Sequence, residues 1–197
     1  MVRMKIKDIR RRELIDATIT SVANRGLSDT TLANIADLAG VSPALVSHYF
    51  DGKEDLLAAT LLRLVRDLAT EIRRQTPKMA TPYQRLEAII DSCLETRPLN
   101  PGAIVAWRAF WAQIPYFPRL ASIQKMINRR FRSNIRAALR ELLPADQVED
   151  TYLGLYALID GFWIRQFIEP ESFGMLDARR ICRQYLDMSI RTAGVRY

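Results

Sequence analysis

The sequence predicts an all-α protein of about nine helices, in which a short N-terminal helix-turn-helix precedes a larger helical bundle. Apolar residues recur at spacings of three and four along almost the whole chain, as they do on one face of a helix. Alternating apolar and polar runs, which are typical of strands, are nearly absent. Hydrophobic residues make up 49% of the 197 residues, which is enough to form a sizeable core.

The first predicted helix ends at Gly26, because glycine readily adopts the left-handed backbone that closes helices. Its buried face is expected to contain residues spaced three or four apart: Leu14, Ile15, Thr18, Ile19 and Val22.

Two short helices follow, over residues 31–39 and 43–49, and the Gly40-Val41 turn separates them. Gly40 permits a left-handed turn, Ser42 is suited to cap the next helix, and Pro43 fits the first position of that helix. We expect Val46 and Phe50 to point inward. The side chains left for a DNA major groove are Pro43, Ala44, Ser47, His48 and Tyr49.

A longer helix is predicted over residues 53–75, and the proline-containing stretch 76–82 ends it. The remaining helices are expected at 82–97, 102–114, 120–142, 146–168 and 176–192. This pattern divides the chain into a DNA-binding segment (1–53), a connecting helix (54–76) and an effector-binding and dimerisation segment (77–197).

The charge of the chain favours an anionic partner, since the formal net charge is +7 and the sequence pI is about 9.7. A basic leader stands directly before the helix-turn-helix, and we expect it to contact phosphates or the minor groove: Arg3, Lys5, Lys7, Arg10, Arg11 and Arg12. No stretch approaches the roughly 18 apolar residues of a membrane-spanning helix. The two cysteines, Cys93 and Cys182, are expected to be buried free thiols of a cytoplasmic protein.

The run from Thr30 to Phe50, continued by Asp51-Gly52-Lys53-Glu54-Asp55-Leu56, resembles the TetR family of repressors. The resemblance implies a homodimer that binds double-stranded operator DNA, with Lys53 at a backbone phosphate. Ser47 departs from the family, which commonly has an aromatic residue there. The predicted DNA-binding residues are Arg10, Arg11, Thr30, Thr31, Ser42, Pro43, Ala44, Ser47, His48, Tyr49 and Lys53.

The C-terminal segment contains a concentration of aromatic residues. Trp107, Phe110 and Trp111 share one helix face, and Tyr116 and Trp163 are added from elsewhere in the chain. They form either an ordinary aromatic core or a cage for a quaternary ammonium ligand, whose charge ring faces attract. Candidate carboxylates that would complement this cation are Asp160, Asp91 and Glu95.

Three further stretches, residues 101–112, 127–134 and 157–165, are similar to the choline-responsive branch of the TetR family. This resemblance implies that choline relieves repression of glycine-betaine synthesis genes. The resemblance to the TetR family also implies that the last two helices form the dimer interface, for which a broad apolar face is available: Tyr152, Leu155, Ile159, Phe162 and Phe167.

His48 is the sole histidine of the chain. Neither a histidine-based catalytic triad nor a multi-histidine metal site can therefore be built, and we expect no enzyme activity, metal or cofactor. A purely architectural DNA binder would leave the aromatic C-terminal segment without a role. Another effector is the main alternative, either a lipophilic cation or an anionic acyl thioester, with efflux or lipid genes as targets. The acid-free basic stretch between Arg119 and Arg140 is consistent with a solvated face, with an anionic effector or with an added nucleic-acid contact.

Overall fold

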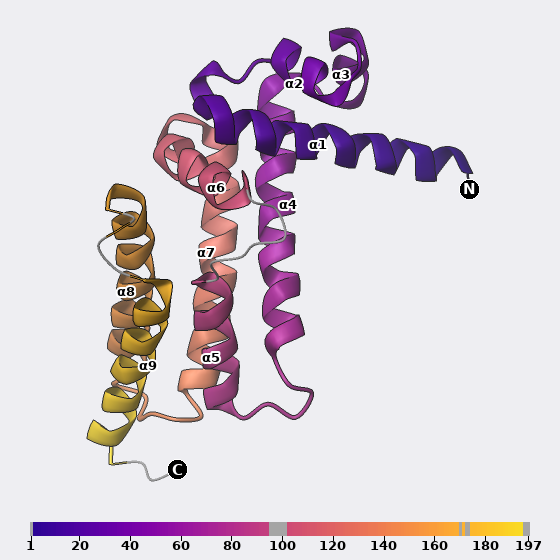
Figure 1. The fold of residues 1–197 in the computed structure, drawn as a ribbon. Coiled ribbons are helices and arrows are strands. Elements are labelled where there is room, and N and C mark those ends of the chain that lie inside the picture. Colours follow the sequence, from indigo (N-terminus) through magenta and orange to yellow (C-terminus); the bar gives the residue numbers. More distant parts are fainter. Residues whose placement is uncertain (1, 95–101, 170, 172–173, 195–197) are drawn as a thin grey trace. The chain divides into compact units, whose positions relative to one another are not determined.

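The computed structural model describes residues 2–94, 102–169, 171 and 174–194, with side chains from residue 6 onward. Over these residues the chain forms nine α-helices, one short 3-10 helix and no strand (Figure 1), which confirms the predicted all-α class. The elements are α1 (Val2–Asp29), α2 (Leu32–Ala39), α3 (Pro43–Tyr49), α4 (Gly52–Gln75), α5 (Pro82–Cys93), α6 (Gly102–Gln113), η1 (Ile114–Tyr116), α7 (Pro118–Leu139), α8 (Val148–Ile168) and α9 (Met175–Thr192).

Local signals in the sequence determine most of these boundaries. Gly26 has a positive φ of 78° inside α1, so the helical path breaks at the predicted glycine before a last turn ends at Asp29. Thr81 caps α5 by accepting a hydrogen bond from the Gln84 amide, and Pro82 occupies the first position. α5 ends at Cys93, four residues before the predicted end, while Gly102 begins α6 as predicted.

The chain folds into two compact units, and neither is continuous in sequence. The first contains Met1–Asp67 and Arg97–Ile127, and the second contains Leu68–Thr96 and Asn128–Tyr197. Consequently α4 and α7 each begin in the first unit and end in the second. These units do not follow the linear division at residues 53 and 76, because α6 packs directly against α1.

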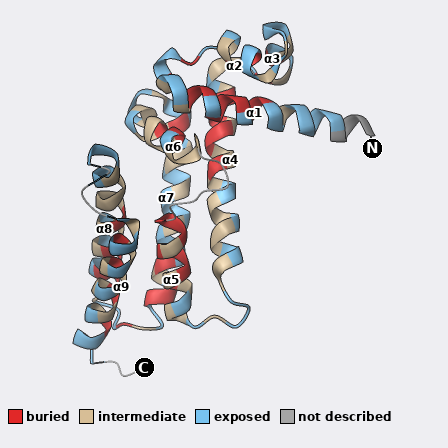
Figure 2. Ribbon diagram, in the orientation of Figure 1, coloured by how far each residue is buried: buried red, intermediate tan, exposed pale blue. Residues whose placement is uncertain are grey.

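The first unit has its own hydrophobic core. Leu14 and Ile19 of α1 are buried with Ile35 of α2, Val46 of α3 and Phe110 of α6. Figure 2 shows α1 exposed near its start, over residues 6–10, and buried positions farther along, from Leu14 onward. The short helices α2 and α3 are thus held by a core that they share with α1, α4 and α6, since neither buries enough apolar surface alone.

The second unit has a separate core. It combines α5, the C-terminal half of α7, α8 and α9, and its fully buried side chains include Leu86, Ile135, Leu155 and Leu186. Tyr152, Leu155 and Ile159 lie in this core, although the sequence placed them at a dimer interface. Their apolar face packs inside the same chain, because α8 contacts α9 and the rest of this unit on that side. The interface prediction for these three residues is therefore wrong.

Candidate functional site

A helix-turn-helix is formed by α2 and α3. Thr31 caps α2 through a reciprocal pair of hydrogen bonds with Asn34, which also accepts from the Thr31 backbone amide. Gly40 follows with a left-handed backbone (φ 64°, ψ 35°), and its amide donates to the Ala36 and Asp37 carbonyls. Ser42 then accepts a hydrogen bond from the Leu45 amide at 3.3 Å and caps α3. The Gly40 turn and the Ser42 cap agree with the sequence prediction, whereas the Thr31 cap was not predicted.

The side chains of α3 divide between a buried and an exposed face. Val46 and Phe50 are buried, as expected, and anchor α3 to the first unit. The Tyr49 ring is half-buried, and the His48 ring packs against it edge to face at 5.2 Å between centroids. The exposed set contains small and hydrogen-bonding side chains that suit a DNA groove: Ser42, Pro43, Ala44, Ser47 and His48.

Three of the predicted phosphate-binding cations have partners within the chain. Arg10 pairs with Glu13 at 2.6 Å. Arg11 donates from Nη1 to the main-chain carbonyl of Tyr49. Lys53, at the start of α4, donates to the Ser28 carbonyl at 3.1 Å, and partial burial lowers the pKa of its ammonium group.

The prediction that Thr30 faces DNA needs correction. Thr30 has no exposed surface, its hydroxyl donates to the Gly26 carbonyl at 2.8 Å, and it also lies 3.2 Å from the Ser21 hydroxyl. Because both contacts close the end of α1, Thr30 stabilises the fold. Thr31 is exposed, although its hydroxyl already serves as the α2 cap. The side chains of Arg3 and Lys5 lie outside the described residues.

The predicted cage residues form two groups, one in each unit. In the first unit, Phe110 of α6 is completely buried in the core, so it is a packing residue and not a ligand contact. Trp107 and Trp111 are half-buried on the same helix. Tyr116, in η1, is 76% exposed and encloses nothing. The α6 indoles therefore remain as candidate cation contacts in this unit.

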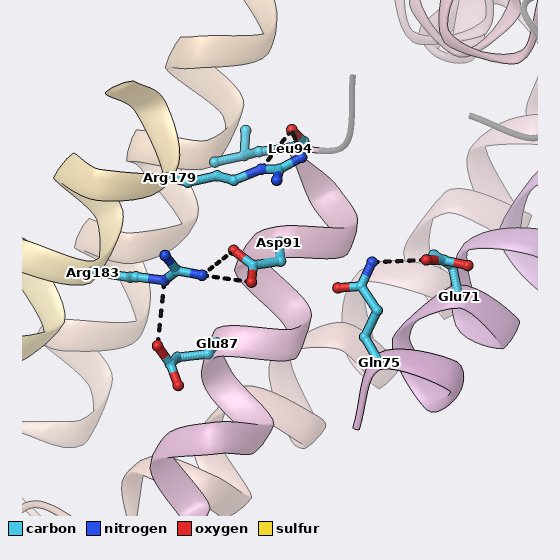
Figure 3. Close-up of polar contacts among 7 residues, drawn as sticks. All are labelled: Glu71, Gln75, Glu87, Asp91, Leu94, Arg179 and Arg183. Carbon is cyan, nitrogen blue, oxygen red and sulfur yellow. Dashed lines mark hydrogen bonds and ion pairs between the residues drawn. The ribbon is translucent and has the colours of Figure 1, made fainter. Parts of the chain in front are cut away.

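Asp91 was predicted to offer a free carboxylate, and the structure corrects this prediction. Arg183 of α9 donates from Nη2 to both carboxylate oxygens, at 2.5 and 2.7 Å, and its Nε lies 3.4 Å from Glu87 (Figure 3). Such a pair neutralises most of the Asp91 charge. The remaining candidate on this stretch, Glu95, lies outside the described residues.

Further polar contacts join α9 to α5. Arg179 donates twice to the Leu94 carbonyl, at 2.9 and 3.1 Å, and so satisfies the exposed end of α5 (Figure 3). The Tyr83 hydroxyl donates to Asp187 at 2.7 Å. These contacts have a structural role, as does the nearby hydrogen bond from Gln75 to Glu71 within α4, also drawn in Figure 3.

Asp160 differs from Asp91, the other predicted carboxylate that the structure describes. It is half-buried on α8 and makes no hydrogen bond or ion pair in the part of the chain that the structure describes. Burial raises the pKa of its carboxyl group from 3.8 to about 6, because no nearby cation offsets the loss of hydration. At neutral pH the group is therefore a charge without a partner inside the protein.

Aromatic side chains accompany Asp160 within the second unit. Tyr156, one turn earlier on α8, lies close enough that Asp160 and burial together raise the pKa of its phenol. The Tyr156 ring packs at 5.7 Å from Tyr152 and 5.8 Å from Phe131. Trp163, three residues after Asp160, donates from its indole to the Cys93 carbonyl at 2.7 Å. The sequence analysis missed Tyr156, although its spacing of four from Asp160 was a usable signal.

The basic stretch on α7 is partly neutralised. Arg119 pairs with Asp55 at 2.6 Å, and Glu149 pairs with both Arg132 and Arg136. Four further cations, three on this helix and Arg140 directly after it, are exposed and make no ion pair with any described residue: Lys125, Arg129, Arg130 and Arg140.

Other kinds of site find no support among the residues with described positions. No group of histidine, cysteine and carboxylate side chains is arranged to hold a metal ion. Cys93 and Cys182 are buried and free, and burial raises the pKa of the Cys93 thiol to about 12. None of the helices combines the length and the apolar character required to cross a bilayer.

Comparisons with known proteins agree with this division of roles. Residues 14–60 match the family described as "Bacterial regulatory proteins, tetR family", and residues 82–191 match the "BetI-type transcriptional repressor, C-terminal" domain. A relative from Ectopseudomonas mendocina, named HTH-type transcriptional regulator BetI, is 37% identical over 98% of this chain and all of its own length. Its counterpart from Burkholderia mallei is 36% identical, over 95% of this chain and 96% of that protein.

Solved structures show the same fold. A transcriptional regulator from Pseudomonas aeruginosa PAO1 is 26% identical, with a TM-score of 0.77 over 94% of this chain and 92% of its own. A regulator from Rhodococcus superimposes with a TM-score of 0.84 at 22% identity, covering 95% of this chain and 99% of the other. A regulator from Saccharomonospora viridis, solved in complex with choline, has a TM-score of 0.80 at 20% identity, covering 90% and 95% of the two chains.

Proposed function

The chain belongs to the TetR family of bacterial regulatory proteins and carries a BetI-type C-terminal domain, and from this premise we propose a homodimeric repressor that choline releases from its operator. The target genes are those of glycine-betaine synthesis, as the resemblance to choline-responsive repressors implies. The names of the relatives and the choline complex of a protein with the same fold support this effector. The observation in this chain that carries the proposal is the unpartnered carboxylate of Asp160.

Asp160 suits a quaternary ammonium ion better than a primary amine. A quaternary ammonium ion has no N–H group, so a protein recognises it by negative charge and by the faces of aromatic rings. Asp160 supplies the charge from α8, and Tyr156 and Trp163 supply rings within one turn of it on the same helix. We assign the cation to this group of three residues. A bound cation would also offset the cost of keeping the carboxylate ionised at this site.

Trp107 and Trp111 are a second candidate for the same chemistry in the first unit, since both remain partly accessible on α6. None of the three candidate carboxylates, Asp91, Glu95 and Asp160, belongs to the first unit. We therefore rank the α6 pair below Asp160 as the cation site, and the calorimetric experiment below separates the two.

The dimer in this proposal uses the exposed faces of α8 and α9. Apolar side chains that the protomer leaves in solvent lie along both helices: Leu153, Ile164, Ile168, Leu176 and Met188. A second copy covering them would remove this surface from water. Two copies of α3 would then enter successive major grooves roughly 34–36 Å apart. Choline shifts the population from a dimer that spans this distance to one that does not. This shift requires choline to bind the second form of the dimer more tightly than the first.

Isothermal titration calorimetry with choline tests the effector. Wild-type protein should bind choline, and Asp160→Asn should weaken binding by at least about tenfold, because the variant keeps the shape and removes the charge. Asp150→Asn is the matched control, since Asp150 is an exposed carboxylate on the same helix. The double variant Trp107→Ala and Trp111→Ala should bind as wild type. If only that double variant loses choline binding, the cation site is the α6 pair and not Asp160.

A mobility-shift assay tests the repressor function. The protein should shift the intergenic DNA upstream of its own gene, should lose this complex when the half-sites of a palindrome are scrambled, and should release the DNA when choline is added. Since phosphate contacts contribute much of the affinity, the complex should weaken steeply with salt. Absence of a palindrome-dependent complex refutes the operator part of the proposal.

A second candidate effector is an anionic acyl thioester. The exposed cations of α7 and of the residue after it favour this effector, since they have no acidic partner among the described residues: Lys125, Arg129, Arg130 and Arg140. An acyl-coenzyme A that dissociates the DNA complex when choline does not would select this alternative, with lipid genes as the targets.

A further inference from the structure

Arg11 and Arg12 are adjacent in the sequence and identical in chemistry, yet they have different surroundings. Arg12 is exposed and makes no hydrogen bond, ion pair or ring contact with another described residue. Arg11 is half-buried, and its guanidinium group links α1 to the C-terminal end of α3. One basic residue of the leader therefore has a defined partner inside the domain, and its neighbour is available to solvent.

Arg11 makes two contacts at the end of the recognition helix α3. Its Nη1 donates to the carbonyl of Tyr49, the last residue of α3, 38 positions away in sequence. Its guanidinium carbon also lies 4.1 Å from the centre of the Phe50 ring, close enough for a cation–π interaction. Phe50 is the C-terminal cap of α3, and its backbone amide donates to the Val46 carbonyl.

These contacts act where α3 most needs support. A helix of seven residues is too short to hold its own geometry, so contacts with the rest of the domain determine its position. Its last carbonyls lack partners within the helix and carry partial negative charge, which a guanidinium satisfies. Val46 and Phe50 fix the inner face of α3 by burial, and Arg11 adds a directional bond at one end.

We propose that Arg11 is a positioning residue that sets the orientation of α3 in the major groove and thereby the sequence specificity, instead of binding a phosphate itself. The proposal rests on the DNA-binding role of α3 described above. A phosphate contact would contribute equally to every DNA sequence. A residue that orients the reading helix affects operator DNA more than a scrambled duplex, because base contacts depend on the angle and depth of that helix.

The test measures binding of Arg11→Ala to two probes over a range of salt concentrations. The first probe is the palindromic duplex from the upstream intergenic DNA, and the second is a duplex of the same length with scrambled half-sites. We expect the affinity of Arg11→Ala for the palindrome to fall by about tenfold, the cost of roughly one lost base contact. Affinity for the scrambled duplex should change by less than about threefold, with an unchanged salt slope for both probes.

Arg12→Ala is the charge-matched control, since it also removes one cation from the same turn of α1. Arg12→Ala should keep the wild-type ratio of the affinity for the palindrome to the affinity for the scrambled duplex. If Arg12→Ala reduces this ratio as much as Arg11→Ala does, the effect is one of net charge and the proposal fails. It also fails if Arg11→Ala lowers the salt slope by about 0.9, the value for one lost phosphate contact, or if both probes weaken equally.

Arg11→Lys keeps the charge and provides a measurement if the alanine variant does not fold. Lysine lacks the planar fork, so the ratio should fall by a smaller factor with the salt slope unchanged. A wild-type ratio in Arg11→Lys, with no folded alanine variant, would overturn the proposal. If the wild-type protein itself does not distinguish the two duplexes, the proposed operator function is at fault and not the role of Arg11.

Discussion

Asp160 gives the most direct test of the structure, because burial of its carboxylate lowers the stability of the folded protein by an amount that depends on pH. The pKa of the carboxyl group rises from 3.8 to about 6 on folding, so the folded protein holds this proton more tightly than the unfolded chain does. Stability therefore falls as the pH rises between about 4 and 6 and stays at the lower level above that range. Two pKa units correspond to at most about 3 kcal/mol, and since the half-buried carboxylate is still screened by solvent, we expect a loss of about 1–3 kcal/mol at neutral pH.

Asp160→Asn removes this cost, because an amide of the same shape carries no charge. In the absence of ligand the variant should be more stable than wild type by about 1–3 kcal/mol at pH 7.5, a rise in Tm of about 3–8 °C for a chain of this length. At pH 4.5 most of the difference should disappear, since the wild-type carboxyl is then protonated in the folded state. Thermal unfolding followed by circular dichroism measures both values, at one protein concentration because a dimer is expected.

The control and the refuting result are equally specific. Asp150→Asn changes an exposed carboxylate in the first turn of α8, where the helix dipole favours negative charge, so it should lower stability slightly, by less than about 1 kcal/mol. If Asp160→Asn is no more stable than wild type at pH 7.5, or if its advantage is independent of pH, the Asp160 carboxylate is not an uncompensated charge. The cation site would then lose its main physical support.

Three more outcomes follow from contacts in the structure. Thr31→Ala should cost about 1 kcal/mol in urea unfolding, since it removes the capping hydrogen bond to Asn34; an unchanged midpoint would contradict the cap. Cys93 and Cys182 should resist a thiol reagent in the native state at pH 8, because both are buried and burial raises their thiol pKa values to about 12 and about 11; rapid labelling would show that this region opens. Phe110→Ala should cost about 3–5 kcal/mol in the same unfolding assay, whereas a ligand-contacting ring outside the core would cost far less.

Features encoded over a few residues could be predicted from the sequence. Gly40, Ser42 and Pro43 determine the turn and the start of α3 through backbone preferences and a cap that involve only their neighbours. The buried positions of Val46 and Phe50 follow from helical spacing in the same way. The recognised family resemblance covered the same segment, and the match over residues 14–60 confirmed it.

What the sequence could not determine is which polar group finds a partner. Arg11 and Arg12 look alike in a sequence, as do Asp91 and Asp160. Arg11 donates to Tyr49, 38 residues away, and Asp91 pairs with Arg183, 92 residues away, whereas Arg12 and Asp160 make no hydrogen bond or ion pair with any described residue. The charge of a side chain is a property of its residue type, but its desolvation and pairing depend on elements brought together by packing. The tertiary structure alone therefore decided which of these carboxylates has an ionic partner and which of these arginines contacts the end of α3.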